Sequence, residues 1–255
     1  MWHGRTVSVV LPTYNERDSI RQCVIDFLAT GVVDDVVVVN NNASPGTSEE
    51  VATTDAREVH EPRQGYGFAC QRGLREARGD YVVLCEPDGT FLARDIFKML
   101  AFSDDSDIIY GSRTARMFIW HGANMGLFLR WGNWAVAKMM EFLFNATNLT
   151  DVGCTFRLLN RTALDQLQPY YRIGGSAFGP EMMLMSFVAG LRTIQIPVNY
   201  LPRVGASSVT GDPRKALLLG LEMIVLVLRY RLASWLGRGR WGTLAAASSS
   251  SRSSA

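Results

Sequence analysis

A run of four valines, Val36–Val39, constrains the fold of this chain more than any other feature. A short continuous apolar run is typical of a β-strand that is buried on both faces, and such strands belong mainly to parallel sheets. Comparable runs lie at Val7–Leu11, Tyr81–Cys85 and Ile108–Tyr110. We therefore expect these segments to form the central strands of one sheet that helices cover on both faces.

Helical patterns separate these apolar runs. Ser19–Thr30 carries apolar residues at helical spacing, and a second helix is expected from Gly67 to Arg78. This alternation predicts an α/β fold with a mainly parallel sheet. In the second half of the chain we expect strands at Thr155–Leu159 and Thr193–Tyr200 and a helix at Pro180–Ala189.

The composition agrees with a globular protein built around one large domain. Of the 255 residues, 47% are hydrophobic and 20% are charged, which excludes disorder over most of the chain. The net charge of 26 − 24 = +2 does not support nucleic-acid binding through bulk electrostatics. The four cysteines lie far apart, which argues against a zinc site or a disulfide scaffold. The first residues lack a signal-peptide pattern, so we expect a cytoplasmic protein.

A long apolar helix is expected at Arg214–Trp235. Its apolar part, Ala216–Leu228, contains Glu222 and is shorter than the roughly 20 residues that a membrane-spanning helix needs. Basic residues on both sides favour a helix lying at a membrane interface, and packing against the sheet is the alternative. The aromatic stretch Met117–Phe144 has the same two interpretations, a lipid-facing surface or a core helix.

These features divide the chain into three parts. The main domain is expected over residues 1–212 and the apolar helix with its basic flanks over residues 213–240. Residues 241–255 form a low-complexity tail.

Polar loops follow the first four predicted strands. They are Pro12–Glu16, Asn40–Thr47, Glu86–Thr90 and Gly111–Arg113. In an open parallel sheet, ligands bind beyond the carboxyl ends of the strands, so these loops should meet at one crevice. None of them is a Walker P-loop or a G-x-G-x-x-G loop, which gives little support to ATP or NAD binding.

Within these loops, the acidic pair Glu86 and Asp88 is the most specific indication of a chemical function. Two carboxylates that flank one residue at the end of a buried strand can face a common divalent cation. A hard cation such as Mg²⁺ would neutralise charge on a leaving diphosphate. The alternative is an acidic turn that caps the next helix.

The order of these motifs resembles that of family 2 glycosyltransferases with the GT-A fold, a Rossmann-like sheet flanked by helices. The similar segments are VSVVLPTYNE, VVVVNNNASPGT, GYGFACQRGLREARGDYVVLCEPDGTF and YGSR, followed by TDVGCTFRLLNR and IPVNYLPRVGASSVTGD. Together they cover roughly residues 6–210. The pattern is most similar to that of the dolichyl- or polyprenyl-phosphate sugar synthases.

The resemblance implies a nucleotide-sugar donor bound by the first two loops and the segment before the second helix. The positions expected to hold the nucleotide are Pro12, Tyr14, Glu16, Asn40, Asn41, Arg63, Gln64 and Gly65. Asn40 and Asn41 replace a usual Asp-Asp pair. Amides keep the hydrogen-bonding capacity of these positions and remove their negative charge.

The resemblance also implies a metal site and a set of phosphate contacts. Glu86 and Asp88 stand at the D-x-D motif and would hold Mg²⁺ or Mn²⁺. Arg113, Arg203 and Arg130 fall near positions that contact diphosphate or acceptor phosphate. A catalytic carboxylate is expected near Glu181, which has the alternative explanation of a first-turn helix residue favoured by the helix dipole.

Three departures from the family pattern bear on the metal and on the acceptor. Glu86 is one methylene longer than the usual Asp, and Thr90 replaces a common Gln. Ser208 stands where the R-x-G-x-S-K pattern has Lys, so one phosphate-binding cation is lost. The missing lysine weakens the prediction of a lipid-phosphate acceptor more than the prediction of a nucleotide-sugar donor.

The resulting hypothesis is a metal-dependent, inverting sugar transfer to a polyprenyl phosphate at the cytoplasmic face of a membrane. A hydroxyl acceptor on a glycan or small molecule is one alternative, and it would need a general base such as Glu181. A non-catalytic module that binds nucleotide sugars is another. The sequence leaves the oligomeric state open.

Overall fold

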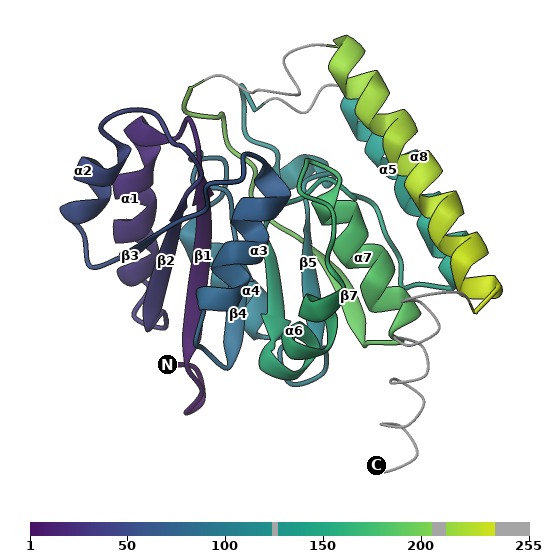
Figure 1. Ribbon diagram of the computed structural model, residues 1–255, viewed down its shortest axis with the longest axis horizontal. Helices are drawn as coiled ribbons and strands as arrows, with labels where there is room; N and C mark the ends of the chain where they lie inside the picture. Colours follow the sequence, from purple (N-terminus) through teal and green to yellow (C-terminus); the bar gives the residue numbers. More distant parts are fainter. Residues whose placement is uncertain (124–126, 206–212, 238–255) are drawn as a thin grey trace.

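The computed structural model describes residues 1–123, 127–205 and 213–237, and it contains one seven-stranded sheet in the order β3-β2-β1-β4-β6-β5-β7 (Figure 1). The strands are β1 Val7–Thr13, β2 Asp35–Asn40, β3 Arg57–His60, β4 Tyr81–Leu84, β5 Ile108–Ser112, β6 Arg157–Asn160 and β7 Thr193–Pro197. The α-helices are α1 Arg17–Leu28, α2 Thr47–Ala52, α3 Tyr66–Glu76, α4 Ile96–Leu100, α5 Leu127–Phe144, α6 Arg161–Leu167, α7 Phe178–Val188 and α8 Pro213–Trp235.

The predicted α/β fold with a mainly parallel sheet is confirmed, with one reversed strand. β6 pairs antiparallel with both β4 and β5, while β1 pairs in parallel with β2 and β4. β3 was not predicted; it is a short edge strand whose residues are half-buried or exposed. The short helices α2, α4 and α6 were not predicted either. These segments bury too few residues to show a clear apolar period.

The apolar strands build two cores, one on each face of the sheet. Val36 and Val38 join the core that contains α1 and α4, while Val37 and Val39 join the core that contains α3, α6 and α7. Successive side chains of a strand point to opposite faces, so the valine run contributes to both cores. For this reason every residue of the run is apolar, whereas a strand buried on one face would alternate apolar and polar residues.

Helices α5 and α8 lie side by side along one flank of the molecule (Figure 1). One side of α8 is buried through Met223, Val227 and Tyr230, which join the core next to α7. Its other side carries an exposed apolar stripe, which consists of Leu218, Leu221, Val225, Leu228, Leu232 and Trp235. In the part of the chain that the structure describes, none of the helices has the length and apolar character needed to cross a membrane.

A buried polar network ties the carboxyl end of β5 to β7. Arg113 donates to both carboxylate oxygens of Asp151, at 2.8 and 3.0 Å, and Asp151 has no exposed side-chain surface. The amide of Gln195 accepts from the backbone N–H of Thr150 at 2.6 Å and donates to the carbonyl of Asp151 at 2.6 Å. The segment that holds Asp151 is therefore fixed against the sheet.

Gly73 sets the distance between α3 and the sheet. A Cβ atom at this position would lie 2.2 Å from a methyl carbon of Val10 and 2.8 Å from one of Val39. We expect Gly73→Ala to lower the free energy of unfolding by about 1–3 kcal/mol, measured by urea denaturation, because overpacking forces α3 away from the strands. Gly132→Ala is the matched control, since that helical glycine has nothing within 4 Å. Equal stability of the two variants would contradict this account.

The Arg113–Asp151 ion pair predicts a specific dependence of stability on pH. Burial opposes ionisation of Asp151, but the charge and hydrogen bonds of Arg113 outweigh it and lower the pKa of the carboxyl group. The stabilisation is therefore present above the unfolded pKa of about 3.9 and is lost as the pH falls through the lower folded pKa. We expect Asp151→Asn to lower the free energy of unfolding at neutral pH by about 3 kcal/mol, and to flatten the acid limb of the stability curve.

Asp165→Asn is the control for this measurement. Asp165 forms an exposed pair with Arg161 at 3.6 Å, and such pairs contribute less than about 1 kcal/mol. If both variants lost stability equally across the pH range, the buried pair would not have the role described.

Candidate active site

The loops that follow β1, β2 and β4 lie together at the carboxyl edge of the sheet. The backbone N–H of Ser44 donates to the carbonyl of Tyr14 at 2.7 Å, which joins the first two loops. The Ser19 hydroxyl donates to the carbonyl of Pro87 at 2.6 Å, which joins the start of α1 to the loop after β4. Three of the predicted polar loops thus meet where parallel neighbours end.

The first loop is shorter than expected, because β1 continues through Pro12 to Thr13. Pro12 is buried and lies opposite Val39 in register. β4 pairs with β1 only as far as Val10, so the N–H that proline lacks is not required on that side. The structure therefore places Pro12 in the sheet rather than in the loop.

Glu16 shapes the turn between β1 and α1. One of its carboxylate oxygens accepts from the backbone N–H groups of Tyr14 and Asn15, at 2.7 and 2.8 Å. The Tyr14 side chain is left exposed beside this turn. Of the residues predicted in this loop, Tyr14 presents a side chain to solvent, and Glu16 stabilises the backbone that carries it.

The side chains of Asn40 and Asn41 face the protein. Asn40 donates to Ser48 at 3.0 Å and to Glu58 at 2.9 Å. Asn41 donates to the carbonyls of Glu61 and Arg63, at 2.7 and 2.8 Å. Both N–H donors of each amide are therefore used inside the molecule. These hydrogen bonds fix the loops that follow β2 and β3. The nucleoside contact that the resemblance implies for Asn40 and Asn41 stays a prediction.

The segment Arg63–Gly65 depends on Asn41 for its position. The carbonyl oxygen of the Asn41 side chain accepts from the backbone N–H of Gly65 at 2.9 Å and from the Gln64 amide at 3.3 Å. Gly65 has a φ of +148°, and a Cβ atom there would lie 2.3 Å from the carbonyl oxygen of Gly174. A side chain at Gly65 would therefore push the start of α3 away from its neighbour.

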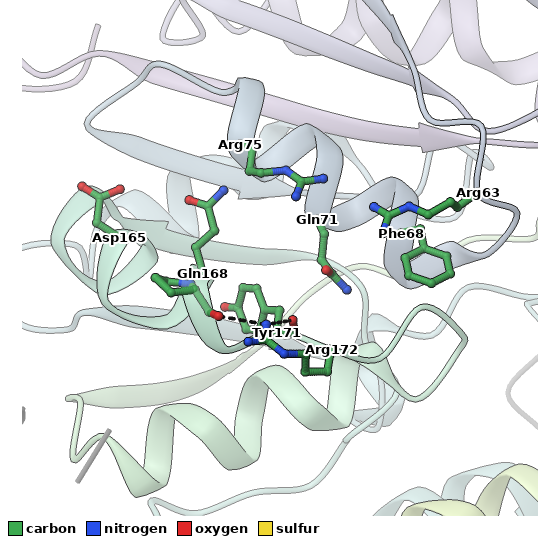
Figure 2. Close-up of a pocket in the computed structure, with 9 residues that line it drawn as sticks. Arg63, Phe68, Gln71, Arg75, Asp165, Gln168, Tyr171 and Arg172 are labelled. Atoms are coloured by element: carbon green, nitrogen blue, oxygen red, sulfur yellow. Dashed lines mark hydrogen bonds between the residues drawn. The ribbon is translucent and has the colours of Figure 1, made fainter. Parts of the chain in front are cut away.

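A pocket of about 490 Å³ lies on the other side of this segment, between α3 and residues 165–172. Figure 2 shows Arg63 beside Phe68 at one end of the pocket and Asp165 at the other. The pocket shares only Arg63 with the positions predicted to hold the nucleotide. Neither Glu86 nor Asp88 lines it.

The two acidic side chains converge on one cation, the guanidinium of Arg203. Nη2 of Arg203 donates to Glu86 at 3.0 Å and forms a closer ion pair with Asp88. Asp88 is only 2% exposed, and its other carboxylate oxygen accepts from the backbone N–H and hydroxyl of Thr90, at 2.9 and 2.5 Å. Burial, and then the charge of Asp88, raises the pKa of Glu86 to about 7, although Arg203 opposes the shift.

This donor set fits a hard divalent cation. Two carboxylates that already share one positive group offer the oxygen ligands that Mg²⁺ and Mn²⁺ prefer. Among the residues that the structure describes, no group of three or more His, Cys, Asp or Glu side chains forms a metal cage. A cation at Glu86 and Asp88 would therefore take its remaining ligands from a substrate or water, as Mg²⁺ commonly does beside phosphates.

Backbone hydrogen bonds between the segment around Arg203 and the loop after β4 place Arg203 beside the acidic pair. The N–H of Leu201 donates to the carbonyl of Thr90, and the N–H of Val204 donates to the carbonyl of Asp88, both at 2.9 Å. The segment over residues 201–204 thus lies along the loop that follows β4. Ser208, which departs from the family pattern, is outside the described residues.

Arg113 is held by Asp151 and lies over the ring of Tyr200, with its guanidinium carbon 5.3 Å from the ring centroid. It is near enough to Glu86 to oppose the rise in the pKa of that group, behind the larger effects of burial, Asp88 and Arg203. Neither Asp151 nor Tyr200 was predicted as a site residue, although both stand in the motifs that carry the resemblance. Arg130 lies on α5 and is partly exposed.

Glu181 does not have the surroundings of a general base. It is fully buried in the first turn of α7. One of its oxygens accepts from the backbone N–H groups of Arg172 and Ile173, at 3.1 and 2.9 Å, and the other accepts from the Tyr230 hydroxyl at 2.7 Å. Its carboxylate has no solvent contact, and this geometry gives Glu181 a structural role at the start of α7. The catalytic role expected for it stays a prediction.

Comparison with known proteins identifies similar glycosyltransferases. The chain is 28% identical over 214 residues to the low-salt glycan biosynthesis hexosyltransferase Agl6 of Haloferax volcanii, covering 82% of this chain and 51% of that protein. It is 27% identical over 231 residues to a dolichyl-phosphate hexose transferase of the same organism, covering 89% and 96%. It is 27% identical over 253 residues to an undecaprenyl-phosphate mannosyltransferase of Micrococcus luteus, covering 92% and 99%. The chain thus spans about half of the first relative and nearly all of the other two.

The fold is similar to that of a solved GT-A structure, glucosyl-3-phosphoglycerate synthase from Mycobacterium tuberculosis in complex with Mn²⁺, UDP and glucosyl-3-phosphoglycerate. The TM-score is 0.67 at 19% identity, over 89% of this chain and 80% of that one. Residues 8–168 match the family model described as glycosyl transferase family 2. The chain therefore belongs to glycosyltransferase family 2 and has the GT-A fold.

Proposed function

We propose that this enzyme transfers a hexose from a nucleotide-diphosphate sugar to a polyprenyl phosphate. The convergence of Glu86 and Asp88 on one cationic group, at the edge where three polar loops meet, is the observation that carries the proposal. The relatives named for dolichyl phosphate and undecaprenyl phosphate support the choice of acceptor.

The proposed chemistry assigns roles to the acidic pair and to Arg203 at this edge. Asp88 and Glu86 would hold Mg²⁺ or Mn²⁺, which would neutralise charge on the departing nucleoside diphosphate. Arg203 adds a second positive group beside the same carboxylates and would stabilise the developing negative charge. Tyr14 offers an exposed aromatic surface to the nucleotide base.

A phosphate acceptor agrees with the position of Glu181. In the proposed reaction an acceptor phosphate oxygen bonds to the anomeric carbon as the bond to the diphosphate breaks, which inverts the configuration. Because that oxygen is already anionic, the step needs no general base. A hydroxyl acceptor would need one, and the carboxylate expected to act in that way is fully buried.

The apolar stripe of α8 supports contact with a membrane surface. Its residues recur every three or four positions along the helix, so they share one side. Trp131 and Trp134 are exposed on the neighbouring α5, and Arg229 is exposed on α8. Exposed apolar and aromatic groups with a nearby cation are typical of interfacial helices. This position would bring the enzyme to a lipid-linked acceptor.

Asp88→Asn tests the proposed metal role. The change keeps the size of the side chain and removes the charge, so we expect sugar transfer to fall about 10²–10³-fold. The measurement is transfer from radiolabelled UDP-, GDP- and dTDP-sugars to polyprenyl phosphate in the presence of Mn²⁺, with Asp165→Asn as the control. Full turnover by the Asp88 variant would contradict the metal role. Donor binding without transfer by the unaltered protein would instead indicate a non-catalytic module.

Substitutions in the apolar stripe test the membrane contact. Removing an exposed leucine from a membrane interface forfeits part of the roughly 2 kcal/mol gained by burying it. We therefore expect Leu221→Gln with Leu228→Gln to weaken binding to phosphatidylglycerol–phosphatidylcholine vesicles by about tenfold or more in a flotation assay. Ile25→Gln with Phe97→Gln is the control, since these exposed residues lie on α1 and α4. Unchanged flotation of the stripe variant would rule out this surface.

A further inference from the structure

The side chain of Arg203 lies at the point where a divalent cation would bind. We propose that Arg203 and the metal compete for Glu86 and Asp88, so that Arg203 holds the acidic pair until metal and nucleotide diphosphate arrive together. This inference rests on the proposed function, because it concerns the cation that the acidic pair would hold.

The contacts of a single nitrogen atom support the competition. Nη2 of Arg203 lies 3.0 Å from Oε2 of Glu86 and is also paired with Oδ2 of Asp88. Mg²⁺ binds carboxylate oxygens at about 2.0–2.1 Å, so a cation bridging these two oxygens would occupy the space that Nη2 fills. Charge repulsion adds to the steric conflict. The guanidinium must therefore leave before the metal can contact both carboxylates.

The backbone around Arg203 allows the side chain to move alone. Hydrogen bonds from Leu201 and Val204 hold the segment on the loop after β4, so the Cα atom of Arg203 stays in place. The Arg203 side chain is 23% exposed, which leaves a path toward solvent at the edge of the sheet. Once released, the guanidinium remains beside the carboxylates and can pair with a phosphate group.

Competition of this kind couples the binding of metal and diphosphate. Metal alone must displace the Arg203 guanidinium, which then loses its ion pairs with both carboxylates. A diphosphate bound at the same time gives the guanidinium a new anionic partner, and charge-assisted contacts of Arg with phosphate are strong. Each ligand should therefore increase the affinity for the other by the same factor, as thermodynamic linkage requires.

A titration with Mn²⁺ alone tests the competition without using activity. Free Mn²⁺ is measured by electron paramagnetic resonance in solutions of the full chain and of Arg203→Gln, with no nucleotide present. We expect the variant to bind Mn²⁺ about tenfold more tightly, because its acidic pair has no internal cation. Arg203→Lys should lie between the two, since lysine keeps the charge but cannot reach both carboxylates with the same geometry. Arg192→Gln is the control, because Arg192 pairs with Asp107 before β7, at the opposite edge of the sheet.

A second titration measures the coupling. The dissociation constants of UDP and GDP are determined with and without saturating Mn²⁺, and the enhancement by Mn²⁺ should shrink in Arg203→Gln. If both proteins bind Mn²⁺ and Arg203→Gln binds it no more tightly than the unaltered chain, the competition is refuted while the proposed metal site stands. If neither binds Mn²⁺, with or without UDP or GDP, the competition and the proposed metal dependence fail together.

Discussion

Strand β1 is the constraint on which the rest of the structure depends. It hydrogen-bonds in parallel to β2 along one side and to β4 along the other, and its side chains alternate between the two cores. Because the three strands run in one direction, the polar segments that follow them emerge at one edge. Burial of Val7–Leu11 on both faces thus fixes where the charged groups gather.

Those parts of the fold that bury apolar side chains on both faces could be predicted from the sequence. Val36–Val39 is an example, because only a central strand accommodates four successive valines without exposing any. β3 could not be found in this way, since Arg57 and Glu58 are polar and form side-chain contacts at a sheet edge. The reversal of β6 was also missed, because an apolar run does not encode the direction of a strand.

In the candidate site, too, local sequence predicted the residues that lie close together in the chain and did not predict their tertiary contacts. Glu86 and Asp88 were predictable because they are close in sequence and follow a buried strand. Their meeting with Arg203 depends on pairing between segments more than one hundred residues apart. The inward orientation of Asn41 and the burial of Glu181 depend on tertiary contacts that residue type does not reveal.

The hydrogen bond from Tyr230 to Glu181 has a practical consequence for work with this enzyme. Helix α8 supplies a donor to a carboxylate inside the molecule, and Met223 and Val227 fill part of the same interior. Truncating the chain before α8 to improve its behaviour in solution would remove that donor and uncover apolar side chains of α5 and α7. A shortened enzyme would therefore expose apolar side chains that α8 now covers, whereas replacing the outward leucines of α8 by polar residues leaves those contacts intact.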